Sequence, residues 1–120
     1  VAQRIADLLA EGVAPDQIGV LYRTARVGHA VADALSAAGV PWRMAQGAEA
    51  KRELFSGTPS VKLLTMHSSK GLEFSRVFIP DLGGMPYAGE DESDEARLLY
   101  VAMTRALDAV VLSCHSESAF

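Results

Sequence analysis

The sequence has very little cysteine and lacks any long apolar run. Cys114 is the only cysteine among 120 residues, which excludes an intrachain disulfide and a metal site built from several thiolates. No apolar stretch reaches the roughly 18 residues that a membrane span needs, and no secretory signal pattern opens the chain. We therefore expect a soluble protein of the cytoplasm that has no membrane partner.

The chain also lacks an excess of basic charge. It contains 15 acidic and 11 basic residues, but five of the acids fall within residues 90–95, so the acidity is local. This distribution argues against a broad basic face for nucleic acid, although it leaves room for a narrow binding groove. We interpret the acidic run as a solvated loop that leads into a helix N-terminus, where the helix dipole favours acids.

The order of apolar segments predicts an α/β fold. Hydrophobic residues make up 49% of the chain, an ordinary value for one compact globular domain. Helical spacing of apolar residues alternates with short runs that are apolar on both faces, which indicates a mostly parallel sheet flanked by helices in three layers. The expected helices are 2–9, 25–38 and 94–107, and the expected strands are 18–22, 40–44, 61–66, 76–80 and 109–113. Thr24 is expected to cap the second helix, and 46–60 and 83–92 are expected to be connections.

A polar segment follows the predicted strand 61–66. It contains Thr65, His67, Lys70, Gly71 and Glu73. Open α/β sheets bind ligands beyond the carboxyl ends of their strands, and a glycine beside a lysine allows the backbone to approach a phosphate. A polar loop without a ligand remains an equally reasonable interpretation of this segment alone.

Basic residues interrupt the apolar helix predicted for 94–107. Arg97, Tyr100 and Thr104 share one helical face, and Arg105 lies about a quarter turn away. An apolar helix should not bury arginines without partners. Either each arginine pairs with an acid of the same domain, or Arg105 is held out for an anion, whose oxygens a planar guanidinium can bind in pairs.

The sequence lacks the parts that a self-sufficient ATP site requires. It contains no G-x-x-x-x-G-K-[ST] phosphate loop and no aspartate-rich strand end of the Walker B kind. Any phosphate chemistry in which the chain takes part therefore needs a second domain.

Three segments in order resemble the superfamily 1 DNA helicases of the UvrD, Rep and PcrA type. The sequence TMHSSKGLEF at 65–74 resembles their motif V, and DEARLLYVAMTRA at 94–106 resembles their motif VI. The sequence IGVLYRT at 18–24, followed by a helix and Gly-Val-Pro, resembles the opening of their second RecA-like domain. The resemblance implies a RecA-like fold for residues 1–120, in a C-terminal motor domain of an ATP-dependent DNA helicase.

The resemblance also implies roles for individual residues. Arg105 corresponds to the arginine finger that reaches the γ-phosphate of ATP bound on the first RecA-like domain. Glu73 corresponds to the carboxylate on the ribose side, with Gly71 beside the nucleotide. The Mg²⁺ that accompanies ATP would take its ligands from the first domain, which is the implied partner. The positions implied to contact single-stranded DNA are Arg23, Thr65, His67 and Lys70, and those implied to support the site are Arg97, Tyr100 and Thr104.

The sequence departs from the family pattern at two places, and two other functions remain as alternatives. Ala25 stands where relatives often have a DNA-contacting asparagine, and only a short connection replaces the large helical insertion that precedes motif V in full-size members. We expect Arg105 near the edge of the sheet where strands 61–66 and 76–80 finish.

One alternative function is a degenerate, non-catalytic module that binds protein or nucleic acid. The other is a small-molecule enzyme that uses His67 and Glu73 as acid and base.

Overall fold

All the strands of the sheet run in the same direction. The computed structural model describes residues 2–44, 57, 59–69, 71–80, 89 and 91–112. Its elements are α1 (Ala2–Ala10), η1 (Pro15–Gln17), β1 (Ile18–Tyr22), α2 (Ala25–Ala37), β2 (Trp42–Met44), β3 (Val61–Thr65), η2 (His67–Ser69), β4 (Phe74–Ile79), α4 (Glu92–Met103) and β5 (Ala106–Leu112). The five strands lie in the order β2-β3-β1-β4-β5, and each neighbouring pair is parallel.

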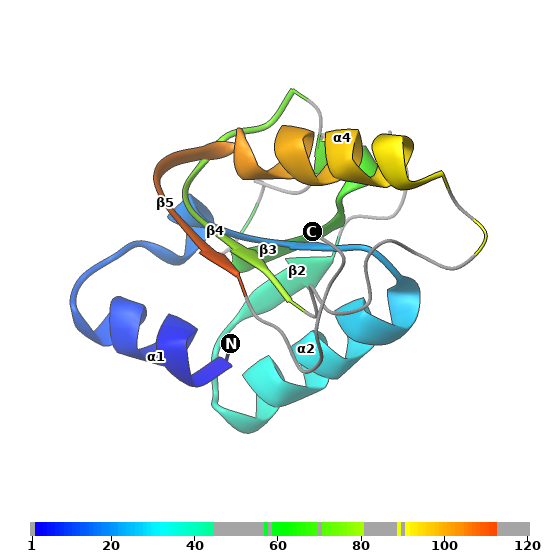
Figure 1. The fold of residues 1–120 in the computed structure, drawn as a ribbon. Coiled ribbons are helices and arrows are strands. Elements are labelled where there is room, and N and C mark those ends of the chain that lie inside the picture. The colour runs from blue at the N-terminus through cyan, green and yellow to red at the C-terminus, as the bar shows by residue number, and fades with distance from the viewer. Residues whose placement is uncertain are drawn as a thin grey trace.

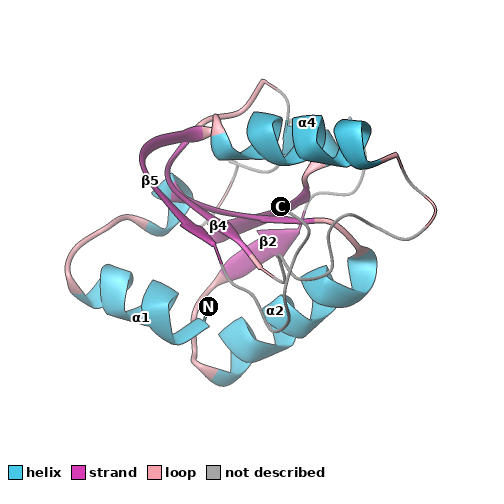
Figure 2. Ribbon diagram, viewed as in Figure 1, coloured by secondary structure: helices cyan, strands magenta, loops and turns pink. Residues whose placement is uncertain are grey.

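Helices cover both faces of this sheet. Figure 1 shows α4 above the sheet and α1 and α2 below it, and Figure 2 shows the same layers by element type. The central strands are therefore enclosed on both sides, and all five residues of β1 are buried. This arrangement confirms the three-layer α/β fold predicted from the sequence. Within the described residues, no helix is long and apolar enough to cross a bilayer.

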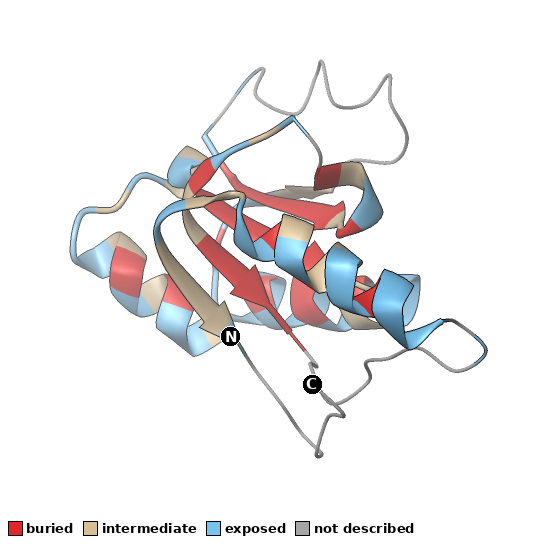
Figure 3. Cartoon of the chain, turned by 45° about the horizontal axis from the view of Figure 1, so that its top comes forward, coloured by how far each residue is buried: buried red, intermediate tan, exposed pale blue. Residues whose placement is uncertain are grey.

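The core consists of two apolar clusters, one for each face of the sheet. Figure 3 shows that the strands in the middle of the sheet are largely buried, whereas the helices have both buried and exposed residues. The cluster under α1 and α2 is centred on Ile5, Val20, Leu35 and Phe78. The cluster under α4 comprises Leu21, Leu64, Met66, Phe74, Val77, Ile79 and Ala102. Alternate residues of one strand enter opposite clusters, as Val20 and Leu21 do, because successive strand side chains point to opposite faces.

Two glycines are required by close packing. A Cβ on Gly19, in the middle of β1, would lie 2.6 Å from the Phe74 ring. A Cβ on Gly28, inside α2, would lie 2.7 Å from the Tyr22 ring. Glycine weakens strand and helix interiors, so its presence at both places indicates that the aromatic rings need this room.

Helix α4 begins and ends earlier than the sequence predicts. The Asp91 carboxylate accepts hydrogen bonds from the backbone N–H groups of Ser93 and Asp94, so the helix begins at Glu92 rather than at 94. At the other end, the Phe74 N–H donates to the Arg105 carbonyl at 2.8 Å, and Ala106 pairs with Phe74. Residues 104–107 were predicted to be helical, but 104 and 105 form a turn and 106 and 107 begin β5. Strand pairing outweighs the local helical preference there.

Other boundaries differ in smaller ways. Strand β4 begins at Phe74 rather than at 76, because it pairs with β5 from that residue onward. Thr24 occupies the N-cap position of α2, but its side chain makes no capping bond, and its buried Oγ1 has no hydrogen-bond partner in the part of the chain that is described. Most of the predicted connections 46–60 and 83–92 lies outside the described residues, as does Lys70.

An ion pair between a buried lysine and a half-buried aspartate joins the start of β1 to β3. Lys62 is fully buried, and its Nζ lies 2.8 Å from Oδ1 of Asp16 and donates to the Ser60 hydroxyl at 2.9 Å. The Asp16 carboxylate also accepts from the Ser60 N–H at 2.9 Å. The hydrogen bond from Lys62, followed by that from Ser60, lowers the pKa of Asp16 below its usual 3.8. Asp16 thus compensates a charge that would otherwise be expensive to bury.

We expect Asp16→Asn to lower the free energy of unfolding by about 3 kcal/mol at neutral pH, since the Lys62 ammonium would stay buried without its carboxylate. A folded-state pKa below the unfolded value stabilises the protein above the unfolded pKa, and this stabilisation disappears as the pH falls through the folded pKa. The difference between wild type and variant should therefore shrink below about pH 4. Urea denaturation at pH 7 and pH 3 measures it.

The matched control is Asp33→Asn, which removes the same charge from an exposed position on α2. It should change the free energy of unfolding by no more than about 0.5 kcal/mol. Equal effects of the two substitutions at pH 7 would show that the pair with Lys62 contributes no specific stability.

Candidate functional site

The polar segments of the sequence lie at the two opposite ends of the parallel strands. We call the side where the strands end the carboxyl edge and the side where they begin the amino edge. Tyr22 pairs with Thr65 at the carboxyl ends of β1 and β3, so Arg23 and His67 follow at that edge. Arg105 directly precedes β5 and binds the start of β4, so it lies at the amino edge. The two edges are roughly 20 Å apart, given about 3.3 Å per strand residue.

This placement corrects the expectation that Arg105 lies near the edge where strands 61–66 and 76–80 finish. Helix α4 connects the parallel strands β4 and β5, so it must run back against them. It begins at the carboxyl edge and ends at the amino edge. A residue that follows its last turn, such as Arg105, therefore lies where the strands begin.

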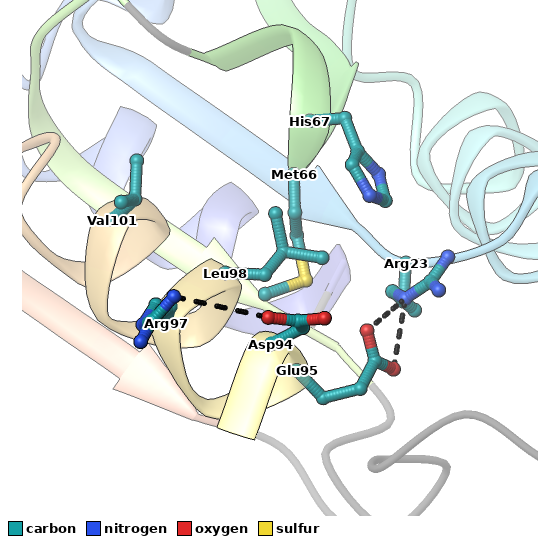
Figure 4. Close-up of a pocket in the computed structure, with 8 residues that line it drawn as sticks. All are labelled: Arg23, Met66, His67, Asp94, Glu95, Arg97, Leu98 and Val101. Atoms are coloured by element: carbon teal, nitrogen blue, oxygen red, sulfur yellow. Dashed lines mark hydrogen bonds and ion pairs between the residues drawn. The ribbon is translucent and has the colours of Figure 1, made fainter. Parts of the chain in front are cut away.

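A pocket of about 510 Å³ opens at the carboxyl edge. It is formed by the residue after β1, by the residues after β3 and by the first two turns and middle of α4 (Figure 4). Its lining combines basic, acidic and apolar side chains: Arg23, Met66, His67, Asp94, Glu95, Arg97, Leu98 and Val101. Three residues predicted to bind or to support the site, Arg23, His67 and Arg97, are thus brought together from distant parts of the sequence.

Arg23 and Glu95 form a largely buried ion pair in this pocket. The Arg23 Nε donates to both carboxylate oxygens of Glu95, at 3.0 and 3.1 Å (Figure 4). The Arg23 side chain is 16% exposed and that of Glu95 only 4%. Removing one partner of such a pair typically costs about 3–5 kcal/mol, because the remaining charge has lost its water. The pair therefore joins the end of β1 firmly to α4.

Glu95 is a site residue that the sequence interpretation missed. The acidic run 90–95 was expected to be a solvated loop, and Asp91, Glu92 and Asp94 are indeed exposed, but Glu95 is buried. A signal for this was present, because Glu95 stands at helical spacing with Leu98, Leu99 and Ala102. An acid on the apolar stripe of a helix requires a partner inside the fold.

The other residues that were predicted to contact DNA or to support the site differ in their exposure and contacts. His67 is exposed on η2 and faces the pocket (Figure 4). The Thr65 hydroxyl donates to the Ser68 hydroxyl at 2.8 Å and accepts from the Ser68 N–H at 3.0 Å, so it holds the turn after β3. Arg97 is 82% exposed, with Nη1 3.9 Å from the Asp94 carboxylate. Such an exposed pair contributes little to stability.

Arg105 is anchored at the amino edge by its neighbours in the chain. Its Nε donates to the Val101 carbonyl at 3.2 Å, and its Nη2 donates to the Thr104 hydroxyl at 3.1 Å. The Thr104 hydroxyl in turn donates to the Val101 carbonyl at 2.7 Å. Among the described residues, no carboxylate forms an ion pair with Arg105. The guanidinium is thus oriented, and its charge is not compensated by an acid of this part of the chain.

Glu73 and Gly71 lie on the approach to this edge. Glu73 is exposed and directly precedes Phe74, whose N–H binds the Arg105 carbonyl. Gly71 has a φ of +84°, a conformation that favours glycine. Tyr100, on the preceding helix, is 70% exposed. An oriented guanidinium and an exposed carboxylate at the same edge suit a ligand that carries both an anionic group and hydroxyl groups.

The structure separates His67 from Glu73. His67 lies at the carboxyl edge and Glu73 at the amino edge, so the two side chains are far beyond the hydrogen-bond reach that a shared acid–base reaction demands. Over the described ranges, no group of three His, Cys, Asp or Glu side chains could hold a metal ion. The distance between His67 and Glu73 favours two binding surfaces over one compact catalytic centre.

Comparisons with known proteins point to one family. Residues 46–117 match the UvrD-like helicase C-terminal domain. The chain is 52% identical over 52 residues to the ATP-dependent DNA helicase Rep of Buchnera aphidicola, and 40% identical over 67 residues to the ATP-dependent DNA helicase PcrA of Staphylococcus aureus. These alignments cover 38% and 48% of this chain, but only 8% and 9% of the two relatives.

A solved structure extends the similarity over almost the whole chain. It is the C-terminal domain of a possible DNA helicase from Lactobacillus plantarum WCFS1, with 25% sequence identity and a TM-score of 0.72. The match covers 98% of this chain and 69% of that one. The parallel sheet with helices on both faces is therefore shared with the C-terminal domain of that possible DNA helicase.

We expect Arg23→Met to lower the free energy of unfolding by about 3–5 kcal/mol, because Glu95 would stay buried without the guanidinium. Replacing both partners, as Arg23→Met with Glu95→Leu, should recover most of that loss. The matched control Arg97→Met removes an exposed arginine of the same pocket and should change stability by less than about 0.5 kcal/mol. Urea denaturation at pH 7 compares the variants, and equal losses at positions 23 and 97 would contradict the expectation.

Proposed function

The chain belongs to the family of UvrD-like helicase C-terminal domains, and from this premise we propose that it is the second RecA-like motor domain of an ATP-dependent DNA helicase. In this proposal residues 1–120 form one such domain without the large helical insertion, and an N-terminal RecA-like domain supplies the phosphate loop and the Mg²⁺ ligands. The observation that carries the proposal is Arg105, an oriented guanidinium at a sheet edge with no acidic partner among the described residues.

Arg105 is suited to act as an arginine finger. A guanidinium that is positioned in advance can stabilise the charge that develops on a transferred phosphoryl group, and such residues contribute a factor of roughly 10³–10⁵ to the rate. The Val101 carbonyl and the Thr104 hydroxyl orient the side chain, and its remaining N–H donors can meet γ-phosphate oxygens. Glu73 and Gly71 would contact the nucleotide from the same edge, on its ribose side. ATP with Mg²⁺ supplies the phosphoryl group itself.

The opposite edge is suited to bind single-stranded DNA. Arg23 and His67 line its pocket, and Thr65 holds the turn from which His67 projects. Lys70 belongs to the same proposed contact but lies outside the described residues. Arginine and histidine side chains at this edge can bind backbone phosphates without reading sequence.

Motif V would connect the two sites. Residues 65–74 lead from the carboxyl end of β3, beside the DNA contact, to the start of β4, beside Arg105. The segment packs under α4, with Met66 and Phe74 buried in the same cluster as Ala102. A shift of this segment with nucleotide state would change the grip on DNA, which is how the domain would take part in translocation.

The second candidate is a degenerate module that binds protein or nucleic acid without ATP hydrolysis. It needs a DNA-binding edge but assigns no task to Arg105. The loss of one guanidinium at the amino edge therefore separates the two proposals.

In the complete protein that carries this domain, we expect Arg105→Ala to lower DNA-stimulated ATP hydrolysis by about 10³-fold or more. Binding of a single-stranded oligonucleotide should change little, because Arg105 lies at the other edge of the sheet. Arg105→Lys should restore only a small part of the activity, since lysine lacks the planar pair of donors. Steady-state phosphate release and fluorescence anisotropy measure the two properties.

The matched control is Arg4→Ala, which removes an exposed arginine from α1 on the opposite face. It should leave hydrolysis close to that of the wild type. Near-normal turnover of the Arg105→Ala protein would defeat the arginine-finger assignment and favour the non-catalytic module.

A further inference from the structure

We propose that Glu95 is a positioning residue for DNA binding: its buried carboxylate on α4 holds Arg23 in the orientation in which Arg23 meets a DNA phosphate. The inference rests on the proposed function, since it assumes that the carboxyl edge binds single-stranded DNA. It assigns to Glu95 a role that neither the motif resemblance nor the family match provides.

The contact geometry supports this role. Both oxygens of Glu95 accept from the same Arg23 Nε, at 3.0 and 3.1 Å, so the carboxylate fixes the guanidinium from its Nε side. In Figure 4 the other guanidinium nitrogens of Arg23 point away from Glu95. A free arginine side chain loses considerable rotamer entropy when it binds a phosphate, and an arginine that is already held loses less. Preorganisation of this kind strengthens binding without adding a contact.

The position of Glu95 makes it a rigid support. It lies in the first turns of α4 at 3% relative exposure, and the same helix packs on the sheet through Leu98, Leu99 and Ala102. Its neighbour Asp94 is 70% exposed, lines the same pocket and lies 3.9 Å from Arg97. The two adjacent acids therefore have different surroundings, although they carry the same charge at the same edge.

An opposite role would be competition, in which Glu95 occupies Arg23 and excludes the phosphate. A phosphate that displaced Glu95 would leave a carboxylate buried without the guanidinium that compensates it, which is strongly unfavourable. DNA is therefore expected to bind Arg23 while the ion pair stays intact. The two roles predict opposite changes in DNA affinity when the charge of Glu95 is removed. Loss of a positioning carboxylate weakens binding, whereas loss of a competing or merely repulsive acid strengthens it.

The test compares Glu95→Gln with Asp94→Asn in the complete protein. Each variant removes one negative charge from the same pocket, and fluorescence anisotropy with a labelled oligothymidylate at fixed salt measures the Kd. We expect Glu95→Gln to weaken binding by roughly fivefold to tenfold, whereas Asp94→Asn should leave it unchanged or strengthen it by about twofold. Equal or tighter binding by Glu95→Gln would overturn the inference.

A double-mutant cycle shows whether Glu95 acts through Arg23. In an Arg23→Gln background, the further change Glu95→Gln should alter the Kd by less than about 1.5-fold. The same fivefold to tenfold loss in that background would assign the effect to the fold in general and overturn the inference. Glu95→Asp supplies a second variant, because it keeps the charge but retracts the carboxylate by one methylene. It should also weaken binding, and unchanged binding would again count against positioning.

The single variant Arg23→Gln distinguishes a failure of the proposed DNA-binding edge from a failure of the role assigned to Glu95. It should weaken binding by roughly tenfold and reduce the slope of log K against log salt by about one. If it does neither, the DNA-binding edge of the proposed function fails, and the inference fails with it. If Arg23→Gln weakens binding but Glu95→Gln does not, the inference alone is wrong. Circular dichroism at the assay temperature first establishes that each variant is folded.

Discussion

Every strand of the sheet runs the same way, and the position of each polar residue depends on that constraint. A helix that joins neighbouring parallel strands must return against them, so α4 begins at the carboxyl edge and ends at the amino edge. Its first turns therefore carry Glu95 to Arg23, whereas its last turn leads to Arg105 at the far side of the sheet. One helix of 12 residues thus contributes to both proposed binding surfaces.

Among the described residues, the buried charges of Lys62 and Glu95 are both paired, and both pairs lie at strand ends. Lys62 meets Asp16 where β1 begins, and Arg23 meets Glu95 where β1 ends. Each pair joins β1 to another part of the fold, and removal of Asp16 or of Arg23 would leave a strongly unfavourable buried charge. Arg105 differs from both, since its contacts within the described residues are a carbonyl and a hydroxyl. That contrast supports a ligand at position 105 and a positioned arginine at position 23.

Much of the fold could be predicted from the sequence, because apolar periodicity reports local structure. The strands at 18–22 and 61–66, the helix at 2–9 and the three-layer parallel arrangement are all confirmed. The largest error lies where pairing between strands overrides a local helical pattern, and a smaller one lies where the Asp91 cap moves the start of α4 to Glu92. Residues 104–107 have a helical pattern, but pairing between Phe74 and Ala106 draws them into β5. The family resemblance, carried by TMHSSKGLEF and DEARLLYVAMTRA, is confirmed by the family match over residues 46–117.

Residue types and their spacing along the chain were enough to predict the fold class and the family, because apolar periodicity and motif order are local properties. The roles of the individual site residues stay predictions. Only the tertiary structure decided which of those residues share a surface. The crossover through α4 separates Arg105 from Arg23 and His67, and the connection between β3 and β4 separates Glu73 from His67. The partnership of Arg23 with Glu95 spans 72 positions of sequence. No local pattern specifies such a pair, because it exists only once α4 has packed across the sheet beside the end of β1.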